Sequence, residues 1–477
     1  MKSKAENKLA PDYSEAYLNL STEYFDSGDY ANSIDAARKT LEFDPDNARA
    51  YHHIGRGLRS LNDYQGSISH YERALELDPA YVSAYSGIAA TYFELKNLTA
   101  VSANCMKAIK LDPTHATGFF QLGMACQEQG NLGAAETFML HSAALDETDY
   151  ATHWNLSLLM LAMGKLEQGW NGYEARWKLQ KALSIEFQHF PYPYWEGEAL
   201  PDKTLLIWWE RDIFDQIMFV SLLDDVMARV KKCIISCPKK LMPLLVRSYP
   251  KAHFICREEP QQLAAVLSEI DVQCPLGSLA RWLRPTVASF PRKPYLVPQA
   301  GRVAYWKKKL AELGPGLKVG LNWRSGNLEG DLRCAQIGQW QSVLSVPGVH
   351  FVNLQIDASA SELGQAKQLT GAPVHAYPEV DLAADLDEAA ALTKALDLVI
   401  AVPTMAANLA AASGVPSWMI TSGFAWQKFG TEESCWYPAV RHFDRKWDKR
   451  WEDFLPAVAR ELYREASKEV SRRGMAQ

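Results

Sequence analysis

Three groups of polar residues in the C-terminal half of the chain each follow an apolar, strand-like run. The first group contains Asp215, and a positioned carboxylate can take the proton of a hydroxyl group. The second contains Arg324 and Ser325, whose side chains can bind phosphate oxygens directly. The third begins at Pro403 and Thr404, where proline suits the first turn of a helix. These residue types are suited to proton transfer and to binding an anion.

The segments that must position these residues alternate between strand-like and helix-like patterns. Such a βαβ order predicts mostly parallel sheets, and we expect two Rossmann-like α/β domains, over residues 178–300 and 301–477. A proline-rich segment, SLARWLRPTVASFPRKPYLVPQAGR, marks the boundary between them. Ligands of open α/β sheets bind at the carboxyl ends of the strands, so the cleft between the two domains is the expected site. The expected strands are TLLIWW, KCIISC, AHFIC, LKVGLNW, HFVNLQI, PVHAY, LDLVIAV and PSWMIT, and the expected helices include DQIMFVSLLDDVMARV and EEPQQLAAVLSEI.

The N-terminal part of the chain has an internal period of 34 residues. Prolines recur at Pro45, Pro79 and Pro113, and aromatic residues recur in phase at Tyr17, Tyr51, Tyr85 and Phe119. This pattern resembles the tetratricopeptide family, in which each repeat is a pair of amphipathic helices that bury their apolar faces by stacking. A fourth unit keeps the phase but has Glu147 in place of proline, and a connecting helix is expected near 173–177. We therefore predict an α plus α/β protein, with the repeats and the connecting helix over residues 11–177.

An array of stacked hairpins has a concave groove, which usually binds an extended peptide or a helix. The array is therefore expected to hold a protein or peptide partner. A dimerisation surface, or a support for the rest of the chain, is the alternative on the same geometric ground.

Net charge, apolar runs and cysteine spacing indicate which partners and which cellular compartment to expect. The formal charge of −6 argues against nucleic acid, which calls for a basic face. The polar start of the chain and the absence of a long apolar run predict a cytoplasmic protein without a membrane span. The eight cysteines are scattered without a CxxC pair, which favours reduced thiols over disulfides or a zinc site.

The order of segments across nearly the whole chain resembles bacterial glycosyltransferases that join tetratricopeptide repeats to a heptosyltransferase-like (GT-B) half, including flagellin and other protein O-glycosyltransferases. The resemblance rests on the segments WEGEAL, LLIWWERDIFDQIMF, VGLNWRSGN, FVNLQ, LDLVIAVPTMAANLAAASGVPSW and ESCWYP, in that order. It implies a nucleotide-sugar donor, a protein acceptor recruited by the repeats, and no metal or other cofactor.

The same resemblance assigns roles to individual residues. Asp215 corresponds to the carboxylate that deprotonates the acceptor, although the family's glycine-rich turn is replaced here by Glu210-Arg211-Asp212-Ile213-Phe214. Thr404 and the helix start of the family's Asp-Thr-small-small-small-His motif are kept, whereas its Asp is Pro403 and its His is Asn408. The residues implied to bind the nucleotide sugar are Trp323, Arg324, Ser325, Asn327, Arg333, Gln355, Thr404, Met405 and Asn408.

Each of these residues also has a structural interpretation. Asp215 at a helix start favours the helix dipole without any catalytic role. Arginines in a glycine-containing loop, such as Arg324 and Arg333, are commonly exposed to solvent. Gln355 at a strand end can face solvent, and the segment Trp436-Tyr437-Pro438 is expected to pack in the core.

The leading hypothesis is a nucleotide-sugar-dependent glycosyltransferase that modifies Ser or Thr of a protein such as flagellin. The lost glycines, Asp and His favour a second hypothesis, a catalytically silent GT-B-like scaffold or binding protein. A pure adaptor that uses only its repeats leaves about 300 residues of organised α/β sequence without a role.

Overall fold

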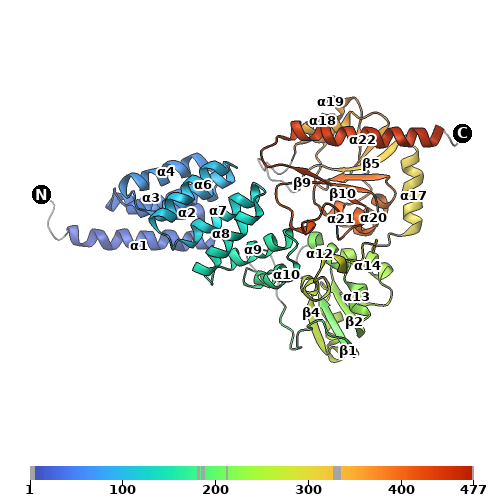
Figure 1. The fold of residues 1–477 in the computed structure, drawn as a ribbon, viewed down its shortest axis with the longest axis horizontal. Helices are drawn as coiled ribbons and strands as arrows, with labels where there is room; N and C mark the ends of the chain where they lie inside the picture. Colours follow the sequence, from blue (N-terminus) through green and yellow to red (C-terminus); the bar gives the residue numbers. More distant parts are fainter. Residues whose placement is uncertain (1–5, 180–182, 184–187, 211–212, 326–334, 475–477) are drawn as a thin grey trace. The chain divides into compact units, whose positions relative to one another are not determined.

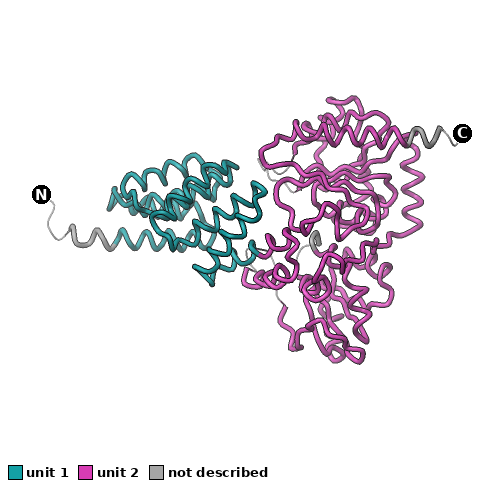
Figure 2. The backbone as a smooth tube through the Cα atoms, in the orientation of Figure 1, with its two compact units in different colours: residues 1–156 teal, residues 157–477 magenta. Residues whose placement is uncertain are grey.

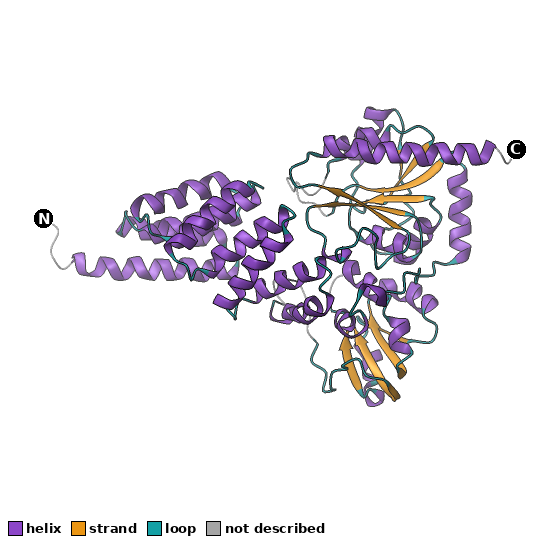
Figure 3. Ribbon diagram, viewed as in Figure 1, coloured by secondary structure: helices purple, strands orange, loops and turns teal. Residues whose placement is uncertain are grey.

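A computed structural model describes residues 6–179, 183, 188–210, 213–325 and 335–474 of the 477-residue chain. The chain divides into two compact units, residues 1–156 and 157–477 (Figure 2). The first is helical, and the second carries two β-sheets with helices around them (Figure 3).

The first unit consists of consecutive antiparallel helix pairs (Figure 1). Within each pair the two helices pack against each other, and the first helices of successive pairs also contact one another. The predicted array of hairpins is therefore confirmed. Its helices are α1 (Glu6–Ser27), α2 (Tyr30–Phe43), α3 (Ala48–Ser60), α4 (Tyr64–Leu77), α5 (Val82–Glu94), α6 (Leu98–Leu111), α7 (Ala116–Glu128) and α8 (Leu132–Leu145), and α9 (Tyr150–Ala162) follows across the division between the units.

The second helix of each of the first four pairs begins at an Asp or Asn that repeats every 34 residues. The side chains of Asp29, Asp63, Asn97 and Asn131 each accept a hydrogen bond from the backbone N–H three residues ahead. Such a cap satisfies one of the backbone donors that a helix start leaves free. The period therefore fixes where the helices begin as well as which faces pack.

Glycine allows α4 and α5 to approach closely. The ring of Tyr71 on α4 is buried against Gly87 on α5, where an added Cβ would lie 2.4 Å from the ring carbon Cζ. Any side chain larger than a hydrogen atom would displace the ring. Gly133 near the start of α8 has no such neighbour within 4 Å.

The second unit begins with a short connection. Helix α10 (Leu166–Tyr173) continues as a 3-10 turn, η1 (Glu174–Lys178), where a connecting helix was expected. Trp170 on α10 is 1% exposed and packs edge-on against Phe219, Trp426 and Trp436. Its indole nitrogen donates a hydrogen bond to the carbonyl of Arg284, at 3.0 Å.

The first sheet has four parallel strands in the order β3-β2-β1-β4. Strand β1 is central and ends in a fully buried run, because both faces are covered. The strands are β1 (Leu200–Trp208), β2 (Val230–Cys237), β3 (His253–Cys256) and β4 (Val272–Pro275), joined through α12 (Ile213–Val220), α13 (Leu223–Met227), η2 (Lys239–Leu241), α14 (Met242–Ser248), α15 (Pro260–Ala264) and η3 (Leu267–Glu269).

The second sheet has six parallel strands in the order β10-β9-β8-β5-β6-β7. It follows a linking region with η4 (Leu276–Ser278), α16 (Leu279–Leu283) and η5 (Val287–Ser289). The strands are β5 (Leu317–Asn322), β6 (Val349–Asn353), β7 (Val374–His375), β8 (Leu398–Ala401), β9 (Ser417–Ser422) and β10 (Val440–Arg445). The helices are α17 (Ala300–Ala311), η6 (Ile337–Trp340), α18 (Gln341–Leu344), α19 (Ala360–Thr370), α20 (Leu386–Lys394), α21 (Met405–Ala412), η7 (Trp426–Lys428) and α22 (Trp451–Gly474).

The parallel α/β architecture confirms the predicted fold class, with corrections to individual elements. The helix expected over DQIMFVSLLDDVMARV is broken into α12 and α13, and EEPQQLAAVLSEI contains only α15 and a 3-10 turn. The edge strand β7 keeps two residues of the expected PVHAY. Strands β4 and β10 were not predicted, because β4 includes a polar Gln273 and ends at Pro275, and only Val440 and Phe443 of the six residues of β10 are apolar.

Candidate functional site

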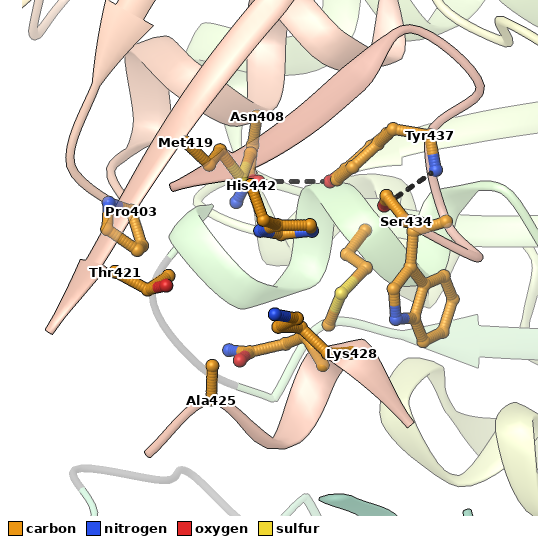
Figure 4. A pocket seen from close by; sticks show the side chains of 12 residues that line it. Pro403, Asn408, Met419, Thr421, Ala425, Lys428, Ser434, Tyr437 and His442 are labelled. Carbon is orange, nitrogen blue, oxygen red and sulfur yellow. Dashed lines mark hydrogen bonds between the residues drawn. The ribbon is translucent and has the colours of Figure 1, made fainter. Parts of the chain in front are cut away.

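A cavity of about 40 Å³ lies near the carboxyl ends of β8, β9 and β10 (Figure 4). The second sheet and the loops that follow it provide most of the wall, and Met218 of α12 adds a side chain from the first α/β domain. Helix α12 also packs against α21, so the two α/β domains meet here. The lining residues are Met218, Pro403, Asn408, Met419, Thr421, Ala425, Gln427, Lys428, Ser434, Trp436, Tyr437 and His442.

Helix α21 begins beside this cavity, as the sequence predicts. Thr404 is its N-cap residue with an extended backbone (φ −144°), but its side chain makes no capping hydrogen bond. The Thr404 hydroxyl is buried and has no hydrogen-bond partner among the described residues. One turn into the helix, Asn408 is buried, and its Oδ1 accepts a hydrogen bond of 3.0 Å from the Tyr437 hydroxyl.

His442 of β10 faces the cavity with an unpartnered ring nitrogen (Figure 4). Its Nδ1 is buried and makes no hydrogen bond within the part of the chain that the structure describes. The pKa of His442 is lowered to about 4, chiefly by burial and also by the positive charge of Lys428, while Asp444 opposes the shift. The imidazole is therefore neutral at pH 7.

Lys428 and Asp444 form an ion pair at the rim, with 2.5 Å between Nζ and Oδ2. The hydroxyl of Thr421 donates a hydrogen bond to the same carboxylate. Burial raises the pKa of Asp444, but the hydrogen bonds from Lys428 and Thr421 outweigh it and keep the carboxylate ionised. The wall around His442 thus carries one positive and one negative charge that compensate each other.

Buried polar atoms without partners gather in this region. Besides the Thr404 hydroxyl and His442 Nδ1, the indole nitrogen of Trp436 is buried and unpartnered in the described ranges. Both amide atoms of Gln216 on α12 are also unpartnered in those ranges, although Gln216 does not line the cavity. A buried polar group that lacks a hydrogen bond costs about 1–3 kcal/mol, so several together point to a polar ligand or bound water.

Arg324, which follows β5, is engaged by two carboxylates. Its Nη1 lies 2.5 Å from Asp357 Oδ2, and its Nε and Nη2 donate hydrogen bonds of 3.1 and 3.2 Å to the two oxygens of Glu362. Burial raises the pKa of Glu362, but hydrogen bonds from Arg324 and from the backbone of Ser359 outweigh it and lower the pKa to about 2. The positive charge predicted to meet a phosphate is thus compensated within the protein.

The neighbouring predicted residues support this ion-pair cluster. Gln355 is buried, and its side chain accepts a hydrogen bond from the Arg324 backbone N–H and donates one to Asp357. Trp323 is fully buried in the core of the second sheet and donates to Glu362 at 3.3 Å. Ser325 is exposed at the edge of the described segment.

The remaining predicted residues differ in how far the structure describes them. Met405 opens α21 and lines a smaller cavity with Leu354 and Leu409, apart from the one around His442. Asp215 lies in the first turn of α12, and its side chain is outside the description. Asn327 and Arg333 lie outside the described residues.

The acidic residue after β1, Glu210, is held in a buried charge network. Arg176 of η1 is completely buried and donates to both oxygens of Glu210, at 2.7 and 3.2 Å. It also donates to Glu174 at 2.7 Å and to the hydroxyl of Ser278 at 2.7 Å. Glu210 accepts a further hydrogen bond from the backbone N–H of Gly277. The carboxylate therefore anchors the turn after β1 to the connection and to the end of β4.

The sequence interpretation missed the β9–β10 side of the cavity. His442 and Asp444 lie two residues apart in the segment VRHFDR, so in a strand their side chains fall on the same face, and this spacing is the signal that was available. Lys428 and Thr421 come from the loop after β9 and from β9 itself, and no local pattern marks them. Trp436 and Tyr437 pack as expected, and they also line the cavity.

No group of three or more His, Cys, Asp or Glu side chains in the described ranges is arranged to hold a metal ion. No helix in that part of the chain is both long and apolar enough to cross a membrane. The seven described cysteines are free.

Family models match the helical array. A TPR repeat model matches residues 55–96, and a tetratricopeptide repeat model matches residues 14–47 and 82–115. The N-terminal hairpins are therefore tetratricopeptide repeats, a family associated with protein interaction.

A curated relative also matches. Protein FlbA of Caulobacter vibrioides is 36% identical over 320 residues, which is 64% of this chain and 53% of the relative. The match therefore spans about half the length of that relative.

Solved structures resemble about a third of the chain. A thermophilic TPR protein of Thermus thermophilus is 19% identical with a TM-score of 0.33, over 36% of this chain and 99% of that one. The pilF protein of Pseudomonas aeruginosa is 18% identical with a TM-score of 0.33, over 35% of this chain and 77% of that one.

Proposed function

We propose that the chain is a nucleotide-sugar-dependent glycosyltransferase whose tetratricopeptide array recruits a protein acceptor. The sugar would be transferred to a Ser or Thr hydroxyl, and flagellin is the acceptor to test first. The observation that carries the proposal is the pair of unpartnered buried polar atoms in the wall of the cavity where the two α/β domains meet, His442 Nδ1 and the indole nitrogen of Trp436. Parallel α/β sheets bind their ligands at this end of the strands.

The proposed reaction is one displacement at the anomeric carbon. The Asp215 carboxylate takes the proton of the acceptor hydroxyl, and the hydroxyl oxygen forms the new bond to the anomeric carbon. The bond from that carbon to the donor's phosphate oxygen breaks, and the nucleoside diphosphate leaves with the electron pair. Neutral His442 and Asn408 offer hydrogen bonds to the donor without adding charge.

The donor's negative charge would be met mainly by the start of α21. Backbone N–H groups in the first turn of a helix point at an anion placed there, and the helix dipole favours it. The unused hydroxyl of Thr404 lies at this helix start. Arg324 would contribute only if the donor displaced Asp357 or Glu362 from it.

The test is calorimetric titration of the purified chain with a panel of nucleoside diphosphates and nucleotide sugars, followed by a transfer assay on flagellin. We expect saturable binding of one nucleotide class and sugar transfer from it. Asp215→Ala should abolish transfer while leaving donor binding and the circular dichroism spectrum unchanged. Asp202→Ala, which removes an exposed carboxylate from β1, is the matched control and should transfer normally.

A second function, a silent binding module, is favoured by two observations. The cavity of about 40 Å³ is far below the roughly 300–1,000 Å³ of small-molecule sites, so a donor would require the domains to open. Arg324 already has carboxylate partners. A folded protein that binds no nucleotide in the panel would exclude the transferase and leave the silent module.

A further inference from the structure

A second cavity, of about 300 Å³, lies at the β4 edge of the first sheet and shares no lining residue with the cavity around His442. Its wall comes from η1, from the stretch before β1, from β4 and from the linking region with α16. The backbone N–H of Trp195 donates to the carbonyl of Gln273 on β4 at 2.9 Å, which fastens that stretch to the sheet. The volume lies at the lower end of the range of small-molecule sites.

Aromatic side chains make up much of this wall, and we call it the aromatic cavity. The indole nitrogen of Trp177 donates to Glu174 at 3.0 Å, and that of Trp195 donates to the carbonyl of Glu198 at 2.8 Å. These nitrogens are therefore already used within the chain, and the rings offer a ligand mainly their π surface. The four aromatic residues are Trp177, Tyr194, Trp195 and Trp282.

Two of these rings already carry a guanidinium group. The Cζ of Arg176 lies 4.3 Å from the ring centroid of Trp177, and the Cζ of Arg281 lies 4.7 Å from that of Trp282. The negative face of an aromatic ring attracts such cations. Tyr194 is 48% exposed, and none of the described arginines or lysines lies over its ring. Its face at the rim is therefore open to a cation from outside the chain.

The carboxylate of Glu174 is a fixed negative charge in the wall. Its Oε1 accepts hydrogen bonds from Arg176 at 2.7 Å and from the hydroxyl of Ser278 at 2.9 Å. Burial raises the pKa of Glu174, but the charge of Arg176 and the hydrogen bonds from Arg176, Trp177 and Ser278 outweigh it and lower the pKa. The group is therefore ionised at pH 7.

Negative charge exceeds positive charge around the aromatic cavity. Arg176 binds Glu210 as well as Glu174, so one guanidinium serves two carboxylates. Glu196 at the rim is exposed, and its carboxylate has no ion-pair partner among the described residues. Arg281 donates to a side-chain amide and pairs with no described carboxylate. Three carboxylates thus stand against two guanidinium groups.

This balance decides the class of ligand. A phosphate-bearing ligand would meet the excess of negative charge. A neutral polyol would need hydrogen-bond donors in the wall, but the hydroxyl of Ser278 already accepts from Arg176 at 2.7 Å and donates to Glu174. A cation gains both from the carboxylates and from the open ring.

We propose that the aromatic cavity binds an organic cation, whose ammonium group lies against the ring of Tyr194 and near the carboxylates of Glu174 and Glu196. A free small molecule and a lysine side chain of a partner polypeptide both present this group. The inference does not depend on the transferase reaction, and the binding assay contains no nucleotide sugar.

The test is a titration of the full-length protein with choline, followed by saturation-transfer NMR of the choline methyl protons at constant ionic strength. The neutral comparison is the alcohol in which a carbon atom replaces the choline nitrogen, because it has the same shape and methyl groups. We expect choline to bind, and the neutral alcohol to bind at least about tenfold more weakly. Raising the ionic strength should weaken choline binding.

Substitutions of exposed wall residues test the ring and the charges separately. Tyr194→Ala should weaken choline binding by about two- to fivefold, whereas Tyr194→Phe, which keeps the ring, should bind as the unmodified protein does. Glu196→Gln should weaken binding by a similar factor, and Arg281→Gln should strengthen it because a repelling charge is removed. Glu312→Gln, at an exposed glutamate that ends α17, is the matched control and should change nothing.

All variants should keep the circular dichroism spectrum of the unmodified protein. Equal affinity for choline and the neutral alcohol, or equal affinity of the Tyr194→Ala and Tyr194→Phe variants for choline, would overturn the proposal. Weaker choline binding by Arg281→Gln would contradict it as well. A peptide of alternating Lys and Ser, added in competition, identifies the source of the cation: displacement of choline assigns a polypeptide side chain, and choline that stays bound assigns a free small molecule.

Discussion

Arg324 illustrates how the surroundings of a side chain decide its role. Three predicted ligand-binding residues, Trp323, Arg324 and Gln355, lie in one hydrogen-bonded cluster with Asp357 and Glu362. The sequence places Arg324 at a strand end, but its carboxylate partners are 33 and 38 residues away. No local pattern reveals that these partners compensate its charge.

Replacement of Arg324 by Ala should destabilise the second α/β domain. The change leaves Asp357 and Glu362 as neighbouring, partly buried carboxylates, and we expect the free energy of unfolding to fall by about 2 kcal/mol. Denaturant titration at pH 7 measures this change. Arg464→Ala, which removes an exposed arginine paired within α22, should change the free energy of unfolding by less than about 0.5 kcal/mol.

The same variant should alter the acid dependence of stability. The pKa of Glu362 is about 2 in the folded chain and about 4.3 when unfolded, so its stabilisation is present above about pH 4.3 and is lost as the pH falls toward 2. Arg324→Ala should make this loss smaller, because the folded pKa returns toward its usual value. A variant with the same acid dependence as the unmodified protein would contradict the role of Arg324.

His442 should contribute an opposite kind of pH dependence. Its pKa is about 4 in the folded chain and about 6.5 when unfolded, so the unfolded chain binds more protons between these values. Stability should therefore be highest above about pH 6.5 and fall by on the order of 1–2 kcal/mol as the pH drops toward 4, allowing for partial exposure. The measurement is denaturant unfolding from about pH 4 to pH 8. His442→Gln should lack this part of the loss, and His141→Gln, at an exposed histidine of α8, should keep it.

At the scale of single elements, packing decides what a glycine does. Gly87→Ala should lower the free energy of unfolding of the array by about 1–3 kcal/mol, because its Cβ would meet the buried ring of Tyr71. Gly133→Ala is the same change at an open helical position, and it should raise stability by about 0.5–1 kcal/mol. Thermal unfolding followed by circular dichroism compares the two. Equal shifts in the same direction would contradict the packing argument.

The elements differ in how well the sequence predicts them. The 34-residue period specifies the hairpins, because prolines, aromatic residues and small residues recur together. The Asp and Asn residues that cap the second helices, at positions 29, 63, 97 and 131, recur with the same period. The prolines and aromatic residues are sufficient to indicate the repeats without them. In the α/β half, long apolar strands such as β1 and β5 are predictable from composition. Strand β10 is not, because it lies at a sheet edge and only Val440 and Phe443 of its six residues are apolar.

At the scale of the whole molecule, the two units should unfold in separate steps. Trp170 lies within the second unit, in an aromatic cluster with Phe219, Trp426 and Trp436. Trp170→Ala should lower the free energy of unfolding of that unit by about 3–5 kcal/mol and leave the transition of the array unchanged. Differential scanning calorimetry resolves the two transitions. Trp447→Ala, at a half-exposed tryptophan of the same unit, should shift neither by more than about 1 °C.

The strand order of the first sheet has a consequence during synthesis on the ribosome. The hairpins of the array close through neighbouring helices as they emerge, whereas β1 pairs with β4 only when residues 67 positions later appear, as Leu205 does with Val272. Translation of that interval takes about 3–13 s at roughly 5–20 residues per second. Until then one edge of an apolar strand stands open, and it can pair with the same strand of another nascent chain. The same holds for β5 of the second sheet, which pairs with β8 as Val319 does with Leu398. Chaperone demand during production of this protein should therefore come from the two sheets and not from the repeats.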